Sequence, residues 1–310
     1  MRFFSKKEPY TKQLSILPPA ASRYRRGVAV AAVVKNEASY IGEWLHYHRA
    51  VGINQFIIYD DGSTDGTSEV IRQTAPPESF QIIPWAGRLI DAPTGNILNS
   101  QAIAFAHAIL NFGSAYRWMA FIDVDEFLLP KSARTVEDAL GAAGGFPVVS
   151  LPWHMFGPGT HVERPSGPVL RNYTTRAADP LSSKKNVSNF KCIVDPCAVS
   201  KVSIHHFEST QHGECTANDA GIKAPTRKAR KDKSFYSSAN LQLNHYYTKS
   251  REELEAKLAR GPASPASRPR YEARVRSAVA SIESDLVEDR AMIDFLDRTG
   301  IELEGGGGGA

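Results

Sequence analysis

Two aspartates separated by one residue follow an apolar run in the first half of the chain. The run covers residues 118–122 (WMAFI), and Asp123, Val124 and Asp125 come directly after it. Hard divalent cations such as Mg²⁺ bind oxygen ligands, usually one or two carboxylates together with the phosphates of a substrate. A metal ion held there neutralises a departing diphosphate as a Lewis acid. The pattern indicates a metal and diphosphate site, and its structural alternative is a solvated acidic turn.

A second acidic pair follows another apolar run. Asp60 and Asp61 come after residues 55–59 (QFIIY), in a loop that contains Gly62 and Gly66. A carboxylate in such a loop can accept hydrogen bonds from a uracil N–H or a ribose hydroxyl. The glycines permit a tight turn and the close approach of a ligand. The alternative is a turn that only caps the next helix.

Three further residues are candidates for nucleotide contact. Asn36 and Glu37 follow the apolar run at residues 27–34, and Asn36 has an amide that could orient a base. Lys191 begins another apolar run and could meet a phosphate. The alternatives are a helix-entry loop for the first two and an exposed lysine at a strand end for the third.

The elements that must position these side chains are predicted from hydrophobic periodicity. Apolar runs predict strands at residues 27–34, 55–59, 80–83, 118–122 and 148–152, and helical spacing predicts helices at 38–51, from 67, and at 99–111. Alternation of strand and helix predicts an α/β fold with a largely parallel sheet that helices cover on both faces. Ligands of such sheets bind outside the carboxyl ends of the strands. The acidic residues above therefore converge on one edge.

The second half of the chain is less regular. Residues 158–185 are expected to form a long loop and residues 217–238 a polar, basic loop. Strands are predicted at 191–194, 199–205 and 241–247, followed by a helix with a Ser250–Glu253 capping box. A last amphipathic helix is expected to place Val275, Val279, Ile282 and Leu286 on one face.

We expect four parts along the chain. They are an N-terminal segment (1–26), one catalytic domain (27–260), a C-terminal helical extension (261–304) and a flexible glycine tail (305–310). The catalytic domain is long because its motifs spread over most of the sequence and must meet at one sheet edge.

Composition narrows the class of protein. The chain has 310 residues and a net charge of +4, which is too small to indicate a nucleic-acid partner. Three cysteines give no disulfide framework, so a reducing compartment is expected. They also lack the paired spacing of a zinc site. We predict a cytoplasmic protein, with peripheral association at the inner face of the membrane through the basic loop as a further option.

Several motifs in order carry a family resemblance. They are VVKNEASYIGEWLHYHRAVGINQFIIYDDGSTDGT, WMAFIDVDEFLLP, LPWHMFGPGTH, KCIVDP, IHHF and NHYYTKS. Together they resemble the family-two-like glycosyltransferases, and within them the branch of family ninety-two. The resemblance covers residues 28–257 and implies the GT-A fold, a Rossmann-like mixed sheet that binds a nucleotide sugar. It also implies inverting transfer from a UDP-linked sugar to a glycan or glycolipid, with Mn²⁺ or Mg²⁺.

The resemblance assigns roles to individual residues. Asp61 matches the aspartate that contacts uridine, and Asp123 and Asp125 match the Asp-x-Asp motif, with Asp125 as the direct metal ligand. GT-A enzymes commonly add a C-terminal histidine to the metal. His245 is favoured for that place, and His206 is the alternative.

The catalytic base is not found in the sequence. The Glu-Asp pair that the family-two pattern often places after its Asp-x-Asp motif is missing between Glu126 and His206. Glu163, Asp179 and Glu208 are the remaining candidates. Two other functions stay open on sequence grounds, a nucleotidyltransferase and a non-catalytic protein that binds a nucleotide sugar or polysaccharide.

Overall fold

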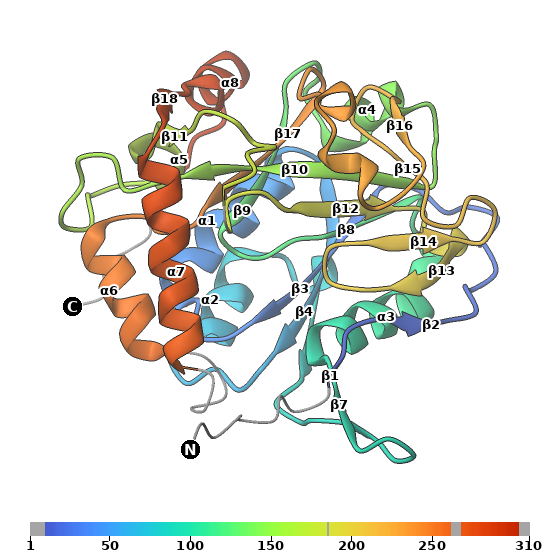
Figure 1. Ribbon diagram of the computed structural model, residues 1–310. Coiled ribbons are helices and arrows are strands. Elements are labelled where there is room, and N and C mark those ends of the chain that lie inside the picture. Colours follow the sequence, from blue (N-terminus) through green and yellow to red (C-terminus); the bar gives the residue numbers. More distant parts are fainter. Residues whose placement is uncertain (1–9, 185, 262–267, 304–310) are drawn as a thin grey trace.

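A mixed β-sheet forms the centre of the molecule (Figure 1). The computed structural model describes residues 10–184, 186–261 and 268–303. The main path of the sheet runs β16-β15-β10-β12-β8-β3-β4-β5. Its parallel part consists of β3 (Val28–Val34), β4 (Ile53–Asp60), β5 (Phe80–Pro84) and β8 (Trp118–Phe121). These four strands end at the same edge.

Antiparallel strands extend the sheet beyond β8. β12 (Phe190–Val194) lies antiparallel between β8 and β10 (Val148–Phe156). β17 (Leu241–Tyr246) runs parallel to β10 and antiparallel to β9 (Glu126–Pro130). The shorter strands are β1 (Tyr10–Thr11), β2 (Leu14–Ser15), β6 (Ile90–Asp91), β7 (Asn96–Leu98), β11 (Thr175–Ala177), β13 (Val199–Val202), β14 (Phe207–Ser209), β15 (Thr216–Ala217), β16 (Lys223–Ala224) and β18 (Leu286–Glu288).

Helices cover both faces of the sheet because β3 is apolar on both sides. Val28 and Val30 pack with α1 (Ala38–Ala50) and α2 (Thr67–Thr74), whereas Ala29 and Ala31 pack with α3 (Ser100–Phe112). The other helices are α4 (Val136–Leu140), α5 (Val169–Asn172), α6 (Arg251–Arg260), α7 (Arg268–Glu283) and α8 (Ala291–Thr299). The predicted α/β class, with a mixed sheet between helices, is confirmed.

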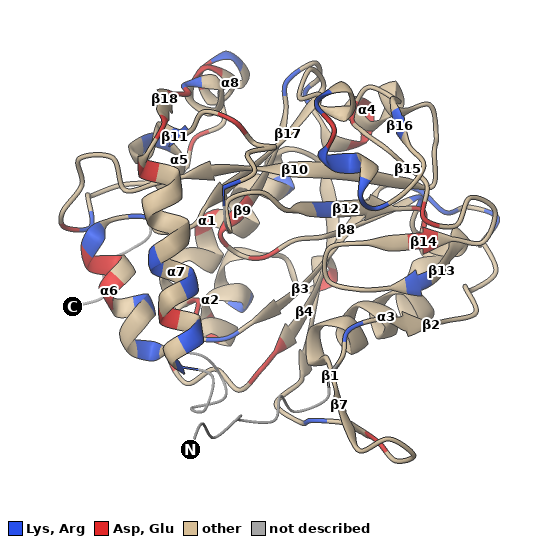
Figure 2. Cartoon of the chain, viewed as in Figure 1, with Lys and Arg blue, Asp and Glu red and all other residues tan. Residues whose placement is uncertain are grey.

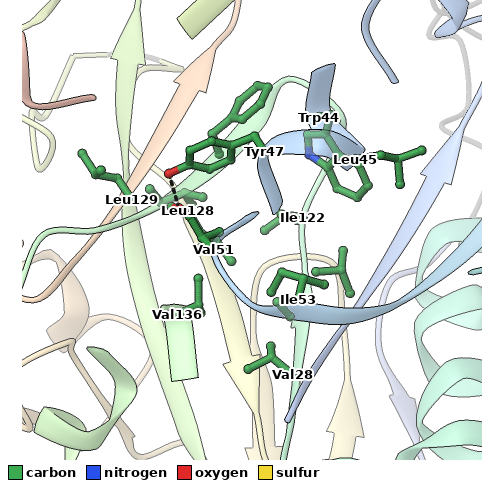
Figure 3. Close-up of a cluster of buried hydrophobic side chains, with 14 of the residues drawn as sticks. Val28, Trp44, Leu45, Tyr47, Val51, Ile53, Ile122, Leu128, Leu129 and Val136 are labelled. Atoms are coloured by element: carbon green, nitrogen blue, oxygen red, sulfur yellow. Dashed lines mark hydrogen bonds between the residues drawn. The ribbon is translucent and has the colours of Figure 1, made fainter. Parts of the chain in front are cut away.

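The core on the α1 side also fixes the strand that follows the Asp-x-Asp motif. Figure 3 shows Trp44 and Tyr47 of α1 among Val28, Ile53 and other apolar side chains. The Tyr47 hydroxyl donates a hydrogen bond of 2.8 Å to the carbonyl oxygen of Leu128 on β9. The packing of α1 therefore fixes the position of β9 and of the turn that precedes it.

The segments that flank residues 27–260 contact the rest of the fold. Lys201 of β13 pairs with Ser15 of β2, and Arg25 forms an ion pair with Asp195. At the other end, α8 contributes Met292, Phe295 and Leu296 to the main core. The glycine tail predicted at 305–310 lies outside the described residues.

The predicted last helix ends earlier than its apolar pattern. Helix α7 stops at Glu283, and Leu286 lies in β18, which pairs with β11. Val275, Val279 and Ile282 are buried, but Leu286 is exposed. The helix ends here because the residues that follow it pair with β11. The Ala178 N–H donates to the Asp285 carbonyl oxygen and the Asp289 N–H donates to the Thr174 carbonyl oxygen, one at each end of this pairing.

The two loops expected in the second half contain short ordered elements. Residues 158–185 include α5 and β11, and residues 217–238 include β16 and short 3₁₀ helices at Ala229–Lys231 and Lys233–Phe235. Figure 2 shows Lys and Arg (blue) and Asp and Glu (red) interspersed along the chain, and both occur on α6 and α7. Within the described residues, no helix is long and apolar enough to span a bilayer.

The capping box of α6 gives a first prediction. Ser250 is buried, its hydroxyl accepts from the Glu253 backbone N–H, and the Glu253 carboxylate accepts from the Ser250 N–H. Replacing Ser250 by alanine should lower the free energy of unfolding by about 1 kcal/mol. Urea unfolding measures this. Ser183→Ala, at an exposed serine outside any helix, is the control, and equal effects of the two changes would contradict the prediction.

Candidate active site

A cavity of about 610 Å³ opens at the edge where the parallel strands end. Asp61 follows β4, and Asp123 and Asp125 follow β8, so parallel pairing brings them to this edge. The cavity is lined by these three aspartates and by Val33, Val34, Lys35, Asn36, Glu37, Ser39, Tyr40, Val124, Tyr247, Thr248, Lys249, Glu253, Ala256, Lys257 and Arg260. Residues from β3, β4, β8 and α6 thus meet around one space.

The two aspartates after β4 have different surroundings. Asp61 lines the cavity, and its carboxylate accepts hydrogen bonds of 2.8 and 3.0 Å from Arg88. Asp60 accepts from the Ser63 backbone N–H and the Ser68 hydroxyl, and it is not among the residues that line the cavity. Asp60 shapes the loop, and Asp61 is the one placed to meet a ligand.

Asn36 and Glu37 lie at the same edge. Asn36 has a left-handed backbone (φ 56°), and its side-chain oxygen accepts a hydrogen bond of 2.8 Å from the Thr64 N–H. This bond ties the end of β3 to the loop after β4. Glu37 lines the cavity, and burial raises the pKa of its carboxyl to about 7.

A group of cations lines the same cavity, and the sequence analysis did not single it out. Lys249 lies with its Nζ 3.7 Å from the centre of the Tyr40 ring. Lys257 donates to the carbonyl oxygen of Tyr247, and Arg260 donates to that of Asn36. Lys257 and Arg260 are three residues apart on α6 and therefore share a helix face. In the sequence, this spacing could have identified Lys257 and Arg260 as two cations on one helix face.

Asp123 forms an ion pair with a buried lysine, Lys191. Its carboxylate accepts hydrogen bonds from Gln101 (2.9 Å) and from the Nζ of Lys191 (2.7 Å). The Lys191 side chain is 1% exposed and also lies 3.5 Å from a Glu126 oxygen. Burial lowers the pKa of Lys191, but the carboxylates of Asp123 and Glu126 outweigh it and hold that pKa above its usual range.

Lys191 therefore positions the Asp-x-Asp motif. It was predicted as a phosphate contact, with an exposed lysine at a strand end as the alternative, but its side chain is buried and lines neither of the cavities described here. The pairing of β12 with β8 explains this place, because Cys192 lies opposite Phe121 and sets Lys191 beside the residues that follow β8.

Asp125 contacts His245 on β17. One Asp125 oxygen lies 3.3 Å from the His245 Nε2, and the other lies 3.6 Å from the Lys257 Nζ. Burial raises the pKa of Asp125, but the charges of His245 and Lys257 outweigh it, so that the pKa falls below its usual range. Buried Nδ1 of His245 and Oε1 of Glu126 have no hydrogen-bond partner and are 3.9 Å apart.

The alternative histidine lies elsewhere. His206 is buried near the start of β14, and neither of its ring nitrogens has a hydrogen-bond partner. Burial lowers its pKa to about 4. His206 lines neither cavity, so among the two histidines considered for the metal, the structure brings His245 to the Asp-x-Asp motif.

A second cavity of about 540 Å³ adjoins the first. It shares Asp123, Asp125, Tyr247 and Lys257 with the first cavity. Its other lining residues are Gln101, Trp153, Asn186, Ser188, Asn189, Ile204, His205, His245, Tyr271 and Arg274. The buried Trp153 Nε1 and Ser188 Oγ have no hydrogen-bond partner. Aromatic rings beside hydrogen-bonding groups suit a sugar.

The three candidates for a catalytic base lie outside both cavities. Glu163 is exposed, and Asp179 accepts a hydrogen bond from the Leu181 N–H. Glu208 accepts from Gln13 and lies 2.8 Å from the Nζ of Lys201. The three cysteines are free thiols.

The chain matches the family model named glycosyltransferase family 92 over residues 27–278. The chain belongs to glycosyltransferase family 92. It is 30% identical over 212 residues to a family 92 protein of Oryza sativa subsp. japonica, covering 64% of this chain and 33% of that protein. It is 26% identical over 205 residues to a family 92 protein of Ricinus communis, covering 63% and 34%. The chain spans about a third of the length of these curated relatives.

Solved structures show weaker likenesses. A mannosyltransferase of Pyrobaculum calidifontis in complex with GDP-Man and Mn²⁺ is 22% identical, with a TM-score of 0.30 over 43% of this chain and 37% of that one. TarS of S. aureus in complex with UDP is 14% identical, with a TM-score of 0.31 over 56% and 47%.

Membership of the family confirms the predicted branch, and the name of the family agrees with the predicted enzyme class, a glycosyltransferase. The matched region runs past residue 260 into α7, which contributes Tyr271 and Arg274 to the second cavity.

The buried lysine gives the second prediction. Lys191→Met leaves Asp123 and Glu126 without their cation, and breaking a buried ion pair costs about 3–5 kcal/mol. Asp123 is 35% exposed, so solvent screening reduces the expected loss in the free energy of unfolding to about 2–3 kcal/mol. Chemical unfolding measures it. Lys201→Met, which breaks the more exposed pair with Glu208, should cost less than about 1 kcal/mol. Equal losses would contradict a buried role for Lys191.

Proposed function

We propose that this chain transfers a sugar from a UDP-linked donor to a hydroxyl group of a glycan or glycolipid, with inversion and with Mn²⁺ or Mg²⁺. One observation carries the proposal. Two cavities, one lined by carboxylates and cations and the other by aromatic rings, meet at Asp123 and Asp125. A donor and an acceptor can therefore reach the same pair of carboxylates from different sides.

The first cavity suits a nucleoside diphosphate. Asp61 lies at one side of it, where a carboxylate can accept hydrogen bonds from a uracil N–H or ribose hydroxyls. Lys35, Lys249, Lys257 and Arg260 supply positive charge for two phosphates. Asp61 is also held by Arg88, which keeps the carboxylate oriented before a ligand arrives.

Asp125 and His245 fit a divalent metal ion. Their nearest oxygen and nitrogen atoms are 3.3 Å apart, and neighbouring ligands of an octahedral ion at about 2.1 Å lie about 3 Å apart. In the described part of the chain, no group of three His, Cys, Asp or Glu side chains could hold the ion alone. Diphosphate oxygens would complete the coordination, as is usual for Mg²⁺. When bound, the ion supplies Lewis-acid stabilisation of the leaving diphosphate.

The protein's own residues position the reactants. Lys257, 3.6 Å from Asp125, adds a positive charge at the place where the leaving diphosphate becomes more negative. Trp153 and Tyr271 offer faces on which an acceptor sugar can stack. An acceptor in the second cavity approaches from the side away from the diphosphate, and attack from that side inverts the anomeric centre. A cytoplasmic location and membrane contact stay predictions.

A screen of nucleotide sugars tests this function and gives the third prediction. The purified chain is incubated with UDP-glucose, UDP-galactose, UDP-N-acetylglucosamine or GDP-mannose, and released UDP or GDP is measured with Mn²⁺ or with a chelator. We expect release from a UDP-sugar that stops when metal is removed. Asp125→Asn should lower the rate at least about a hundredfold, because the metal contributes several kcal/mol.

The matched control is Asp294→Asn, an exposed aspartate on α8. It should leave the rate unchanged. Full activity of Asp125→Asn, or release that is the same with metal and with chelator, would contradict the proposed use of metal. Release of a sugar 1-phosphate in place of UDP or GDP would contradict sugar transfer itself.

A further inference from the structure

We propose that His205 is the general base that takes the proton from the acceptor hydroxyl in the second cavity. This inference rests on the proposed function and deepens it, because it names the group that the sequence could not supply. His205 lines the second cavity together with Asp123, Trp153 and Tyr271. It does not line the donor cavity.

The hydrogen bonding of His205 selects its tautomer. Its Nδ1 lies 3.0 Å from the carbonyl oxygen of Phe190, and a carbonyl oxygen only accepts hydrogen bonds. Nδ1 therefore carries the proton and Nε2 carries the lone pair. Phe190 precedes Lys191 on β12, so the histidine is fixed to the strand that holds Asp123. The edge of the ring that carries Nε2 is the one left for the cavity.

Packing fixes the orientation of the ring and of its loop. The ring centroid of His205 lies 5.3 Å from that of Trp153, with the planes at 90°. The guanidinium of Arg230 donates a hydrogen bond of 3.0 Å to the His205 carbonyl oxygen and stacks on Phe190. Arg230 belongs to the basic loop of the second half, but its side chain is 2% exposed. This buried hydrogen bond holds the backbone of His205 in place.

The carboxylates of this cavity are already engaged. The Asp123 oxygens accept from Gln101 and Lys191, and the Asp125 oxygens face His245 and Lys257. Among the described residues that line the second cavity, Asp123 and Asp125 are the only carboxylates. Both belong to the proposed metal and donor site, so neither is well placed to serve the acceptor.

The other proton acceptors of this cavity are less suitable. His245 turns its Nε2 toward Asp125. Tyr247 is a phenol whose pKa burial raises further above its ordinary value, so it keeps its proton. Burial, followed by the charge of Lys191, lowers the pKa of His205 to about 3, so its imidazole is neutral and able to accept.

The proposed step is balanced in atoms and charge. The acceptor oxygen forms a bond to the anomeric carbon of the donor sugar as the bond from that carbon to the diphosphate oxygen breaks. The nucleoside diphosphate leaves with the electron pair, and the hydroxyl proton moves to the His205 Nε2. The hydroxyl becomes strongly acidic as its new bond forms, so the proton moves to the imidazole late in the step. The negative charge of Asp123 stabilises the imidazolium, which then loses its proton to water.

Two variants and one control test the role. His205→Asn keeps a donor for the Phe190 carbonyl, and His205→Ala leaves a space for added imidazole. His212→Asn, at an exposed histidine outside both cavities, is the control. Each is assayed with the donor that the screen identifies, with water or methyl glycosides as acceptors. The dissociation constant of UDP with Mn²⁺ is measured in parallel.

We expect both His205 variants to lose about 10²- to 10⁴-fold in turnover, with the UDP dissociation constant unchanged within about threefold. Added imidazole should restore part of the turnover of His205→Ala and none of that of Asp125→Asn. A role in folding alone would give neither the selective loss nor the rescue. Turnover of His205→Asn within about threefold of the wild type would overturn the assignment of His205 and leave the proposed function standing. Wild-type protein that binds no UDP would overturn both.

Discussion

The buried ammonium group of Lys191 is the interaction on which the rest of the site depends. A lysine that is 1% exposed can stay charged only if carboxylates meet it, and Asp123 and Glu126 do so. These three residues come from the end of β8, the start of β9 and the inside of β12. The pairing of β12 with β8 is therefore supported by charge as well as by apolar packing. The same contact holds the Asp123 carboxylate of the Asp-x-Asp motif in place.

This constraint produces two spaces of different chemistry. On one side of the turn lie Asp61, the cations of α6 and the loop after β17, which suit a charged donor. On the other side lie Trp153, His205 and Tyr271, which suit a polar, uncharged acceptor. Helix α6 can reach the donor side because its capping box starts it directly after β17 and α7 packs against it through Val275 and Val279. The C-terminal helices therefore build the site as well as the core.

The sequence predicted the parts that local patterns determine. Strand β3 and helix α1 were placed within a residue, because each combines a buried apolar run or stripe with a clear end. Asp61 and Asp125 were placed after the ends of strands for the same reason, whereas His245 was chosen from the family resemblance. Lys249, Lys257 and Arg260 were missed because their place depends on how α6 folds back over the sheet edge. The sequence also could not show that Lys191 is buried or that Leu286 would join a strand, since both depend on pairing with residues far along the chain.

The central claim is that a metal ion held by Asp125 and His245 joins the two cavities. Pulsed electron paramagnetic resonance of Mn²⁺ bound to the chain with UDP measures this directly, because it detects nuclei that are coupled to the ion. We predict a ¹⁴N coupling from the His245 imidazole together with a ³¹P coupling from the diphosphate, and loss of the ¹⁴N signal alone in His245→Ala. A bound Mn²⁺ with phosphorus coupling but no nitrogen coupling in the wild type would contradict the account.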